Sequence, residues 1–523
     1  MRPHSIRATL LPSGDYRLVV PAAVVWMMTV VGLLAPDAPL RALAAIAATC
    51  CGASIFAIWR RWVRWPRIWV TVVVAGLAAM TLTALVLRID ARDRHPLSHT
   101  DGKVRVTATI RDDPVGLGPA GSERVRVPVA VDGLAGRPVP PTSAELTGAA
   151  DAWVDLLPGQ RVSVLVRVGV PRGPGLDAAR LTAVTGPRLL GRPPPHQRAA
   201  GRVRHRLQVL AARALGPEAA GLLPGLVLGD TGALDQRVRD DFRAAGLTHL
   251  IAVSGSNFAI VTGAAVLAVR MLGASPRLTA VVGLAIVVGF VILVRPSPSV
   301  LRAAMMGTVG LLALAGSRRA QALPALGAAT MVGLLWWPEL AIAPGFVLSV
   351  LATGGLVLWS AALRDWLRDR RVPRGLAELV AMSLAAQLVT APMIASLNGQ
   401  FSVVAVVANI VVTPVVGIIG IVGTAAAVIG AVGGTDQIAA AVADLMIRAL
   451  GPELWWMIAC ARVLGRQSWA TVQVPAGIVG AVMVAAGILA VVSSTLVAID
   501  RRERRLHAAR VGVGPVWHHG RRE

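Results

Sequence analysis

Long apolar runs, separated by short loops that are rich in arginine, make up most of this chain. A helix that crosses a bilayer needs about 20 predominantly apolar residues. Runs of this kind predict spans at about 17–35, 40–59, 68–87, 249–270, 278–294, 300–316, 320–337, 345–363, 376–396 and 475–499. We therefore expect a polytopic α-helical membrane protein.

Two further stretches leave the number of spans open between about ten and about twelve. The apolar stretch 402–432 is interrupted at Pro414 and is either one long span or a broken, re-entrant pair. Residues 438–464 are ambiguous, because Asp444 and Arg448 stand one helical turn apart and Pro452 breaks the pattern.

A different pattern occupies residues 100–192. KVRVTATI from Lys103, RVRVPVAV from Arg124 and RVSVLVRVGV from Arg161 alternate apolar and polar residues, as half-buried strands do. Turns rich in glycine and proline separate these stretches. We expect one small all-β domain of about five strands.

The predicted organisation has five parts. They are a three-span segment at 1–99, the β-rich domain at 100–192, amphipathic connecting helices at 193–246, a transmembrane domain at 247–500 and a basic tail at 501–523. Within the connecting part, a basic helix at 197–215 is expected along the membrane surface. Four of its arginines would meet DNA or lipid phosphate: Arg198, Arg202, Arg204 and Arg206.

Charge adds an orientation. The chain is 55% hydrophobic and only 15% charged, yet its net charge is +24, almost all of it from arginine. Arginine-rich loops stay in the cytoplasm. The loops at 60–67, 270–277, 318–319, 364–374 and 501–505 all face the cytoplasm if the β domain is extracytoplasmic and both termini are cytoplasmic. A polyanionic partner such as DNA is a second explanation of the same charge.

Polar groups within or beside apolar segments are the candidate functional residues, because unpaired polar groups are costly in hydrocarbon. They are Asp230, His249, Ser254, Gly255, Asn257, Arg302, Gln387 and Asn409. Arg302 either snorkels to the interface or contacts phosphate or a carboxylate. Asp230 either caps the helix expected at 235–246 or pairs with an arginine.

The remaining candidates have structural alternatives as well. Ser254 and Gly255 either let helices pack closely or mark a broken helix whose backbone lines a cavity. Asn409, before Pro414, has the same two interpretations. His249 is interfacial or functional, and Gln387 is a candidate for hydrogen bonding between helices.

No residue pattern predicts a cofactor or a metal site. Cys50, Cys51 and Cys460 lie in apolar stretches and are expected to be small buried hydrophobes. The nine histidines are scattered, and the chain contains no phosphate-binding GxxxxGK[ST] loop. We expect no enzymatic activity, and an ATPase that drives any transport must be another protein.

Four segments, in this order, resemble the ComEC family of inner-membrane channels through which competent bacteria take up single-stranded DNA. The first is GDTGALDQRVRDDFRAAGLTHLIAVSG from Gly229, and PSVLRAAM follows from Pro298. PGFVLSVLAT begins at Pro344, and the fourth segment runs from Ala386-Gln387-Leu388 through Gly399-Gln400-Phe401 to Asn409 and Pro414.

The resemblance implies a DNA channel in the cell membrane with an OB-fold-like β domain. The eight candidate residues would then line the DNA path. It also implies single-stranded DNA and membrane lipids as partners, together with a DNA receptor, a separate nuclease and a cytoplasmic ATPase or helicase-type motor. A second copy of the chain is a further candidate partner.

Two departures from the family pattern matter. The family commonly has SGLH where this chain has Ser254-Gly255-Ser256-Asn257, so no imidazole is available there. Many members carry a C-terminal metallo-β-lactamase-like nuclease domain, but this chain has no HxHxDH cluster, and His507, His518 and His519 are not spaced as ligands. Two alternatives stay open: a transporter of another solute on the same fold and, more remotely, an intramembrane hydrolase that uses Ser254 and His249.

Overall fold

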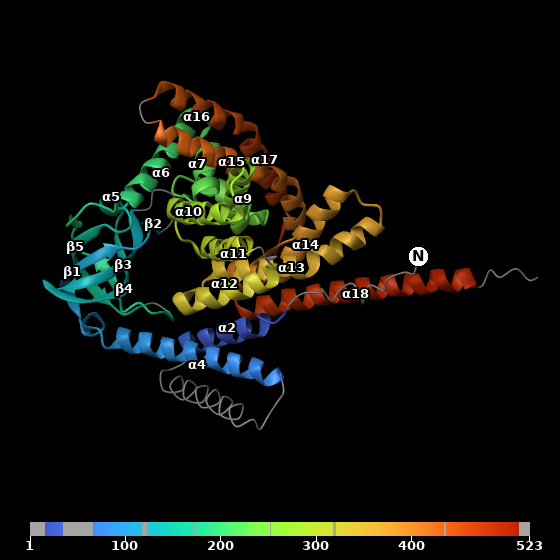
Figure 1. Cartoon of the computed structure of the whole chain (residues 1–523), viewed down its shortest axis with the longest axis horizontal. Helices are drawn as coiled ribbons and strands as arrows, with labels where there is room; N and C mark the ends of the chain where they lie inside the picture. Colours follow the sequence, from blue (N-terminus) through green and yellow to red (C-terminus); the bar gives the residue numbers. More distant parts are fainter. Residues whose placement is uncertain are drawn as a thin grey trace, which may run out of the picture.

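The computed structural model describes residues 16–34, 66–117, 123–171, 173–251, 253–316, 321–433 and 436–511. The predicted span at 40–59, most of the arginine loop at 60–67, and Cys50 and Cys51 lie outside the described residues. The described chain forms a large helical part with one β-rich unit at its side (Figure 1).

Helices long and apolar enough to cross a membrane confirm a polytopic membrane protein; the described residues contain 8 of them. They are α4 (Pro66–Asp93), the segment Thr248–Met271 that includes α9 (Gly255–Met271), α10 (Pro276–Val294), α11 (Pro298–Ala315), α13 (Pro344–Asp369), α14 (Arg374–Asn398), α15 (Ala405–Val432) and α18 (Ile478–Val511). Shorter apolar helices are α2 (Val19–Leu34), α7 (Pro217–Leu228) and α12 (Ala322–Trp336).

The two ambiguous stretches take definite forms. Helix α15 continues through Pro414, so the broken pair of helices does not form. Residues 438–464 become α16 (Gln437–Ala449) and α17 (Gly451–Gly465). The break between them falls where Pro452 enters the first turn of α17, a position at which proline costs no hydrogen bond.

The β unit is a closed barrel. Its strands are β1 (Gly102–Ile110), β2 (Val115–Gly116), β3 (Arg124–Leu134), β4 (Arg137–Ala149), β5 (Arg161–Gly169), β6 (Ala179–Ala183) and β7 (Arg188–Leu189). Five of them follow the order β1-β3-β4-β6-β5, and β5 pairs back onto β1. Only the β4–β6 pair is parallel among these strands. The short helix α5 (Ala150–Trp153) lies between β4 and β5 in the chain.

Alternate residues of the strands fill the barrel. Val106, Val127, Leu146 and Val164 are fully buried, which is the inward half of the period-two pattern. Trp153 is also buried, and a Cβ added at Gly148 would overlap its ring. The aromatic side chain of this domain is therefore part of the core and not a stacking platform.

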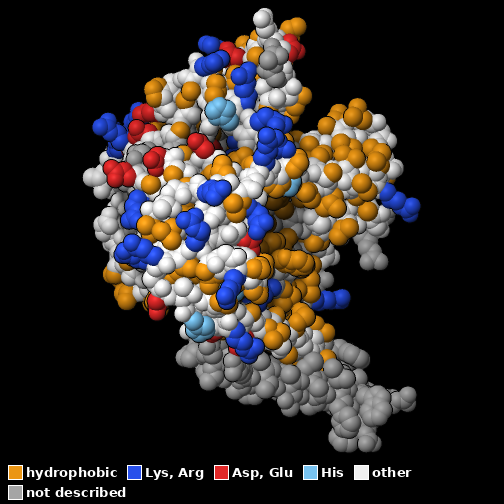
Figure 2. All heavy atoms as spheres, turned by 90° about the vertical axis from the view of Figure 1, so that its left-hand side faces the viewer, with side chains coloured by type: hydrophobic (Ala, Val, Ile, Leu, Met, Phe, Trp, Pro, Cys, Tyr) orange, Lys and Arg blue, Asp and Glu red, His pale blue; other side chains and the backbone are white. Residues whose placement is uncertain are grey.

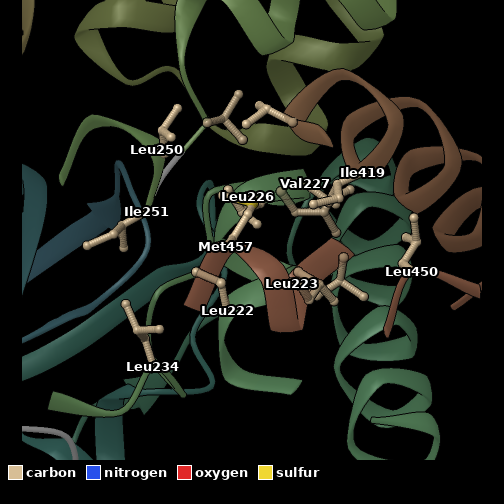
Figure 3. Close-up of a cluster of buried hydrophobic side chains, with 14 of the residues drawn as sticks. Leu222, Leu223, Leu226, Val227, Leu234, Leu250, Ile251, Ile419, Leu450 and Met457 are labelled. Carbon is tan, nitrogen blue, oxygen red and sulfur yellow. The ribbon is translucent and has the colours of Figure 1, made fainter. Parts of the chain in front are cut away.

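Helix α7 is at the centre of the helical part. All its residues from Gly221 to Leu228 are buried, and α6 (Pro195–Ala214), α10, α15 and α17 pack around it. Figure 3 shows Leu222, Leu223, Leu226 and Val227 of α7 among apolar side chains that include Ile419, Leu450 and Met457. A helix that is apolar on all sides needs such an environment.

The basic helix expected at 197–215 packs its apolar face against the protein. Leu207, Leu210 and Ala211 of α6 are buried against its neighbours α7, α10, α15 and α16. Arg204 and Arg206 turn inward, and the Nε atom of Arg206 donates to the Gly430 carbonyl at 3.2 Å. In this structure these two side chains bond to other groups of the protein, whereas Arg198 and Arg202 are exposed.

Candidate functional site

Five helices pack in a ring in the order α9, α11, α13, α14 and α15, with α15 returning to α9. Six of the eight candidate residues lie on these helices or at the N-cap of α9, and a seventh, His249, lies in the turn before α9. Ser254, Gly255 and Asn257 stand at the start of α9, Arg302 is on α11, Gln387 on α14 and Asn409 on α15.

One face of α9 is open and points to the inside of this ring. Ser256, Ala259 and Gly263 on that face are exposed, and a Cβ at Gly263 would meet no atom within 4 Å. Helix α9 contacts α11 at Gly255, α15 at Ile260 and α10 through Phe258. Because successive residues turn by about 100°, the open face lies between the contacts with α11 and α15 and away from α10.

The start of α9 is a break and not a continuous span. The turn Thr248–Leu250 precedes it, and the helix begins only at Gly255. Ser254 is the N-cap, and its Oγ accepts from the Asn257 backbone N–H at 3.2 Å and lies 2.7 Å from Ser256 Oγ. The segment Thr248–Met271 is long and apolar enough to span a membrane, as expected for 249–270. Of the two interpretations of Ser254 and Gly255, the structure shows the break, because a serine that accepts this bond starts a helix.

Arg302 lies at this break. Its side chain is only 7% exposed, so it does not snorkel. The Nε atom donates to Ser349 Oγ on α13 at 2.7 Å, and Nη1 lies 3.2 Å from Met306 Sδ. A Cβ added at Gly255 would overlap Arg302 Nη2, so glycine is what lets the guanidinium approach the start of α9.

No carboxylate among the described residues pairs with Arg302. A buried charge without a counter-charge is strongly unfavourable, so this site favours an anion from outside the chain. The amino-terminal turns of α9, α11 and α13 meet here, since Ser299 Oγ donates to the Val253 carbonyl and Gly345 packs on Pro298. The amino-terminal ends of helices carry positive partial charge.

Asn257 adds an unpaired polar atom nearby. Its side chain is 3% exposed, and Nδ2 donates to the Leu226 carbonyl of α7 at the long distance of 3.5 Å. Its Oδ1 has no partner within the described chain. Buried polar atoms are usually satisfied by protein or water, so this amide has capacity for a further hydrogen bond.

Asp230 does not cap the helix that follows it. The N-cap of α8 (Gln236–Ala244) is Asp235, whose Oδ1 accepts from the Arg237 N–H at 2.7 Å. Asp230 instead accepts from Gln208 Nε2 at 2.7 Å and lies 3.5 Å from Arg204 Nη2. The alternative of an arginine partner is the one that the structure shows, and it places Asp230 outside the ring.

Asp230 belongs to a cluster that we call the barrel junction: Asp113, Arg204, Asp230 and Arg295. Asp113, in the loop after β1, lies 3.0 Å from Arg204 Nη2 and 2.9 Å from Arg295 Nη2. Both arginine side chains are nearly buried. Arg295 was not among the residues expected from sequence, although an arginine at the non-cytoplasmic end of two predicted spans departs from the usual charge bias.

The other candidates do not join the group around Arg302. Asn409 Nδ2 donates to the Ala405 carbonyl of its own helix at 2.8 Å. Gln387 is half-buried on α14, and its side chain makes no hydrogen bond with another described residue. His249 lies in the turn before α9, and none of the hydrogen bonds of Ser254 goes to it.

A second ionic cluster, also missed from the sequence, joins α8 to α17. Asp241 is 8% exposed and binds Arg466 through two bonds of 2.9 and 3.0 Å. Arg462 lies 3.6 Å from Asp241 and 2.6 Å from Glu218 at the start of α7. These carboxylates raise the pKa values of Arg462 and Arg466.

The described residues contain no group of three or more His, Cys, Asp or Glu side chains that could hold a metal ion. What the chemistry offers is a set of hydroxyl groups, a buried amide and a guanidinium at a break in a membrane helix. This arrangement can bind and guide an anion.

The fold and this site define a multi-pass membrane protein whose helix ring contains a buried, unpaired arginine. The family described as "Competence protein" matches residues 226–498, more than half of the chain, and the chain belongs to that family. This finding confirms the resemblance drawn from the four segments.

One relative gives a further comparison. The chain is 29% identical over 200 residues to ComE operon protein 3 of Bacillus subtilis (strain 168). The matched segment is 38% of this chain and spans only 25% of the relative. No solved structure matches the chain.

Proposed function

We propose that this protein is an inner-membrane channel for the uptake of single-stranded DNA during natural transformation. The family supports a role in competence. The observation that carries the channel role is Arg302, a buried guanidinium without a carboxylate at the inside of a ring of membrane helices. A phosphodiester that passes the start of α9 would supply the missing negative charge.

The path in this proposal runs between the open face of α9 and the facing helices. Small and polar residues line it on α9, and Ser349 and Arg302 lie at its outer end. The protein acts as a conduit and not as an enzyme. A DNA receptor, a nuclease and a cytoplasmic motor would be separate proteins.

We propose an OB fold for the barrel. The support is its strand order, β1-β3-β4-β6-β5 closed on β1, with a single parallel pair and a helix between the third and fourth long strands. A five-stranded barrel of this kind is a common nucleic-acid-binding scaffold. We place it outside the cytoplasm, together with the barrel junction.

In this orientation both ends of α15 lie on the barrel side of the membrane. Near its start, Ser402 Oγ donates to the Ala244 carbonyl, and near its end Gly430 accepts from Arg206 of α6. Arg204, two residues away on α6, contacts the barrel residue Asp113. Helix α15, as one continuous helix with both ends on that side, would then not cross the membrane, and the chain would have about ten spans with both termini in the cytoplasm.

The function is tested with a strain that lacks the gene. We expect loss of internalised, nuclease-protected labelled DNA, with normal growth and with recovery when the wild-type gene is restored. Normal DNA uptake in the deletion strain, after confirmed uptake in the parent, would contradict the channel and favour a transporter of another solute.

A further inference from the structure

The barrel junction has the geometry of an anion site that the chain occupies with its own carboxylate. Asp113 Oδ2 accepts from Arg295 Nε at 2.9 Å and lies 3.0 Å from Arg204 Nη2. Its other oxygen, Oδ1, lies 2.9 Å from Arg295 Nη2 without an aligned hydrogen bond. One carboxylate from the barrel thus fills a fork made by two arginines of the helical part.

The two arginines are held in place by other contacts. Arg204 Nη1 donates to the Leu228 carbonyl at 2.7 Å, and Arg295 Nη1 donates to the Gln197 side chain. Their side chains are 11% and 8% exposed, whereas that of Asp113 is 26% exposed. The positive half of the junction is therefore fixed within the helical part, and the negative half is a partly exposed carboxylate on a barrel loop.

Arg295 keeps an unusual backbone conformation in this cluster. Its φ is +73° and its ψ is 153°, a combination that residues other than glycine rarely adopt. It follows the last residue of α10 and stands three residues before α11, the helix that carries Arg302. The contact with Asp113 therefore connects the barrel to the start of the helix on which the proposed path depends.

We propose that Asp113 is a built-in competitor for a phosphodiester anion at Arg204 and Arg295, and that an arriving phosphodiester displaces it and releases the barrel from the helical part. A phosphate oxygen pair binds two arginines in the same forked geometry as a carboxylate does. This inference rests on the proposed DNA channel. It adds a second site for DNA phosphate, at Arg204 and Arg295, whose access is controlled by Asp113. In the absence of DNA, Asp113 holds the barrel against the helical part, and we call this contact the latch.

The test measures binding of a fluorescent single-stranded oligonucleotide to the purified full chain in detergent by anisotropy, at several salt concentrations. Asp113→Asn removes the competing charge and nearly keeps the shape of the side chain. We expect it to bind roughly tenfold more tightly than the wild type, within the range usual for coupled sites. The matched control is Asp132→Asn, which removes another barrel carboxylate that pairs with an arginine, Arg161 at 3.0 Å.

Two additions make the result specific. In Asp113→Asn, the further changes Arg204→Gln and Arg295→Gln should each remove the gain. Hydrogen exchange at residues 110–116 and 293–297 of the wild type should increase when the oligonucleotide is added. Vesicles of anionic phospholipid and free inorganic phosphate serve as separate probes, and a gain with these alone would overturn the nucleic-acid source of the anion.

Unchanged or weaker oligonucleotide binding by folded Asp113→Asn would overturn the inference. So would a gain of the same size in Asp132→Asn. These outcomes are independent of the channel itself: a deletion strain without DNA uptake combined with unaltered binding by Asp113→Asn would keep the channel and reject the latch.

Discussion

At Gly255 the chain leaves room for a guanidinium instead of a side chain. The nearest group to a Cβ at this position is Arg302 Nη2, and the next are Ala303 and the rest of the same guanidinium. A glycine at the first turn of a membrane helix therefore has a packing reason here, in addition to its place after the N-cap Ser254. The guanidinium of Arg302 can lie beside the start of α9 only because Gly255 has no side chain.

A pH-dependent prediction belongs to Asp112, the neighbour of Asp113. Burial raises the pKa of the Asp112 carboxyl above its ordinary value of 3.8. Above that raised pKa, the folded protein holds an ionised group that burial disfavours. The free-energy cost of this buried charge decreases as the pH falls through the raised pKa. It is absent below the ordinary pKa, where Asp112 is protonated in both the folded and the unfolded state.

Asp112→Asn should therefore raise the thermal midpoint of the full chain at pH 7 by roughly 1–2 °C, and the gain should disappear as the pH approaches 3.8. Asp151→Asn is the matched control, since each carboxylate accepts a bond of 2.8 Å from the next N–H and Asp151 is exposed. A gain that does not change with pH would show that the burial of the charge is not its cause.

Sequence alone identified Arg302 and Gly255 as candidates, but not that they lie together, and it did not single out Ser349. The cost of an arginine in an apolar segment can be read from the pattern. Its partners Ser349 and Gly255 are 47 positions later and 47 earlier in the chain, and only the packing of α9, α11 and α13 brings them together. Asp230 had two interpretations, a helix cap or an arginine partner, and the structure shows the second; its partner Arg204 had been expected to meet DNA or lipid phosphate.

One nearly buried carboxylate, Asp241, joins α8 to α17 in addition to their apolar packing. Asp241→Asn should lower the thermal midpoint by several degrees, because it weakens the bonds to Arg466 and Arg462 and leaves two arginines without their shared partner. Asp240→Asn is the control on the same helix, since its carboxylate is exposed and pairs only within α8. Equal effects of both changes would show that the ion pairs of Asp241 do not stabilise the contact between α8 and α17.

At the level of elements, periodicity predicted most helices and the strands of the barrel. It failed where polar caps or tertiary contacts decide the boundary. Helix α9 begins at Gly255, six residues after the start of the apolar run. Pro414 lies inside α15, which packs against six other helices and continues past it. The pairing of β5 with β1, which closes the barrel, depends on contacts that no local pattern contains.

In our proposal, the arginine-rich loops set the orientation of the whole molecule in the membrane. Figure 1 shows the barrel at one end of the helical part and α18 extending toward the opposite end. Figure 2 shows Lys and Arg side chains scattered over the side that faces the viewer, next to a hollow where hydrophobic side chains gather. Sequence predicted the division into a β-rich domain and a helical part. The number of crossings depends on whether the two ends of α15 lie on the same side of the membrane.

Cysteine labelling checks the orientation. In a background without the native cysteines, Arg137→Cys on the barrel and Gln437→Cys at the start of α16 should both react with an impermeant thiol reagent in intact cells. Both positions are exposed. Gly375→Cys at the start of α14 is the cytoplasmic control and should react only after lysis. Labelling of Gln437→Cys only after lysis would mean that α15 crosses the membrane.

The central claim is that a DNA strand passes Arg302, and uptake of labelled DNA by Arg302 variants tests it most directly. At equal protein abundance in the deletion strain, Arg302→Met should abolish uptake, because it keeps bulk and removes the charge. Arg302→Lys should retain part of it, since an ammonium still attracts phosphate as a point charge. Wild-type uptake with Arg302→Met would contradict the account, and so would equal loss of folded protein in both variants.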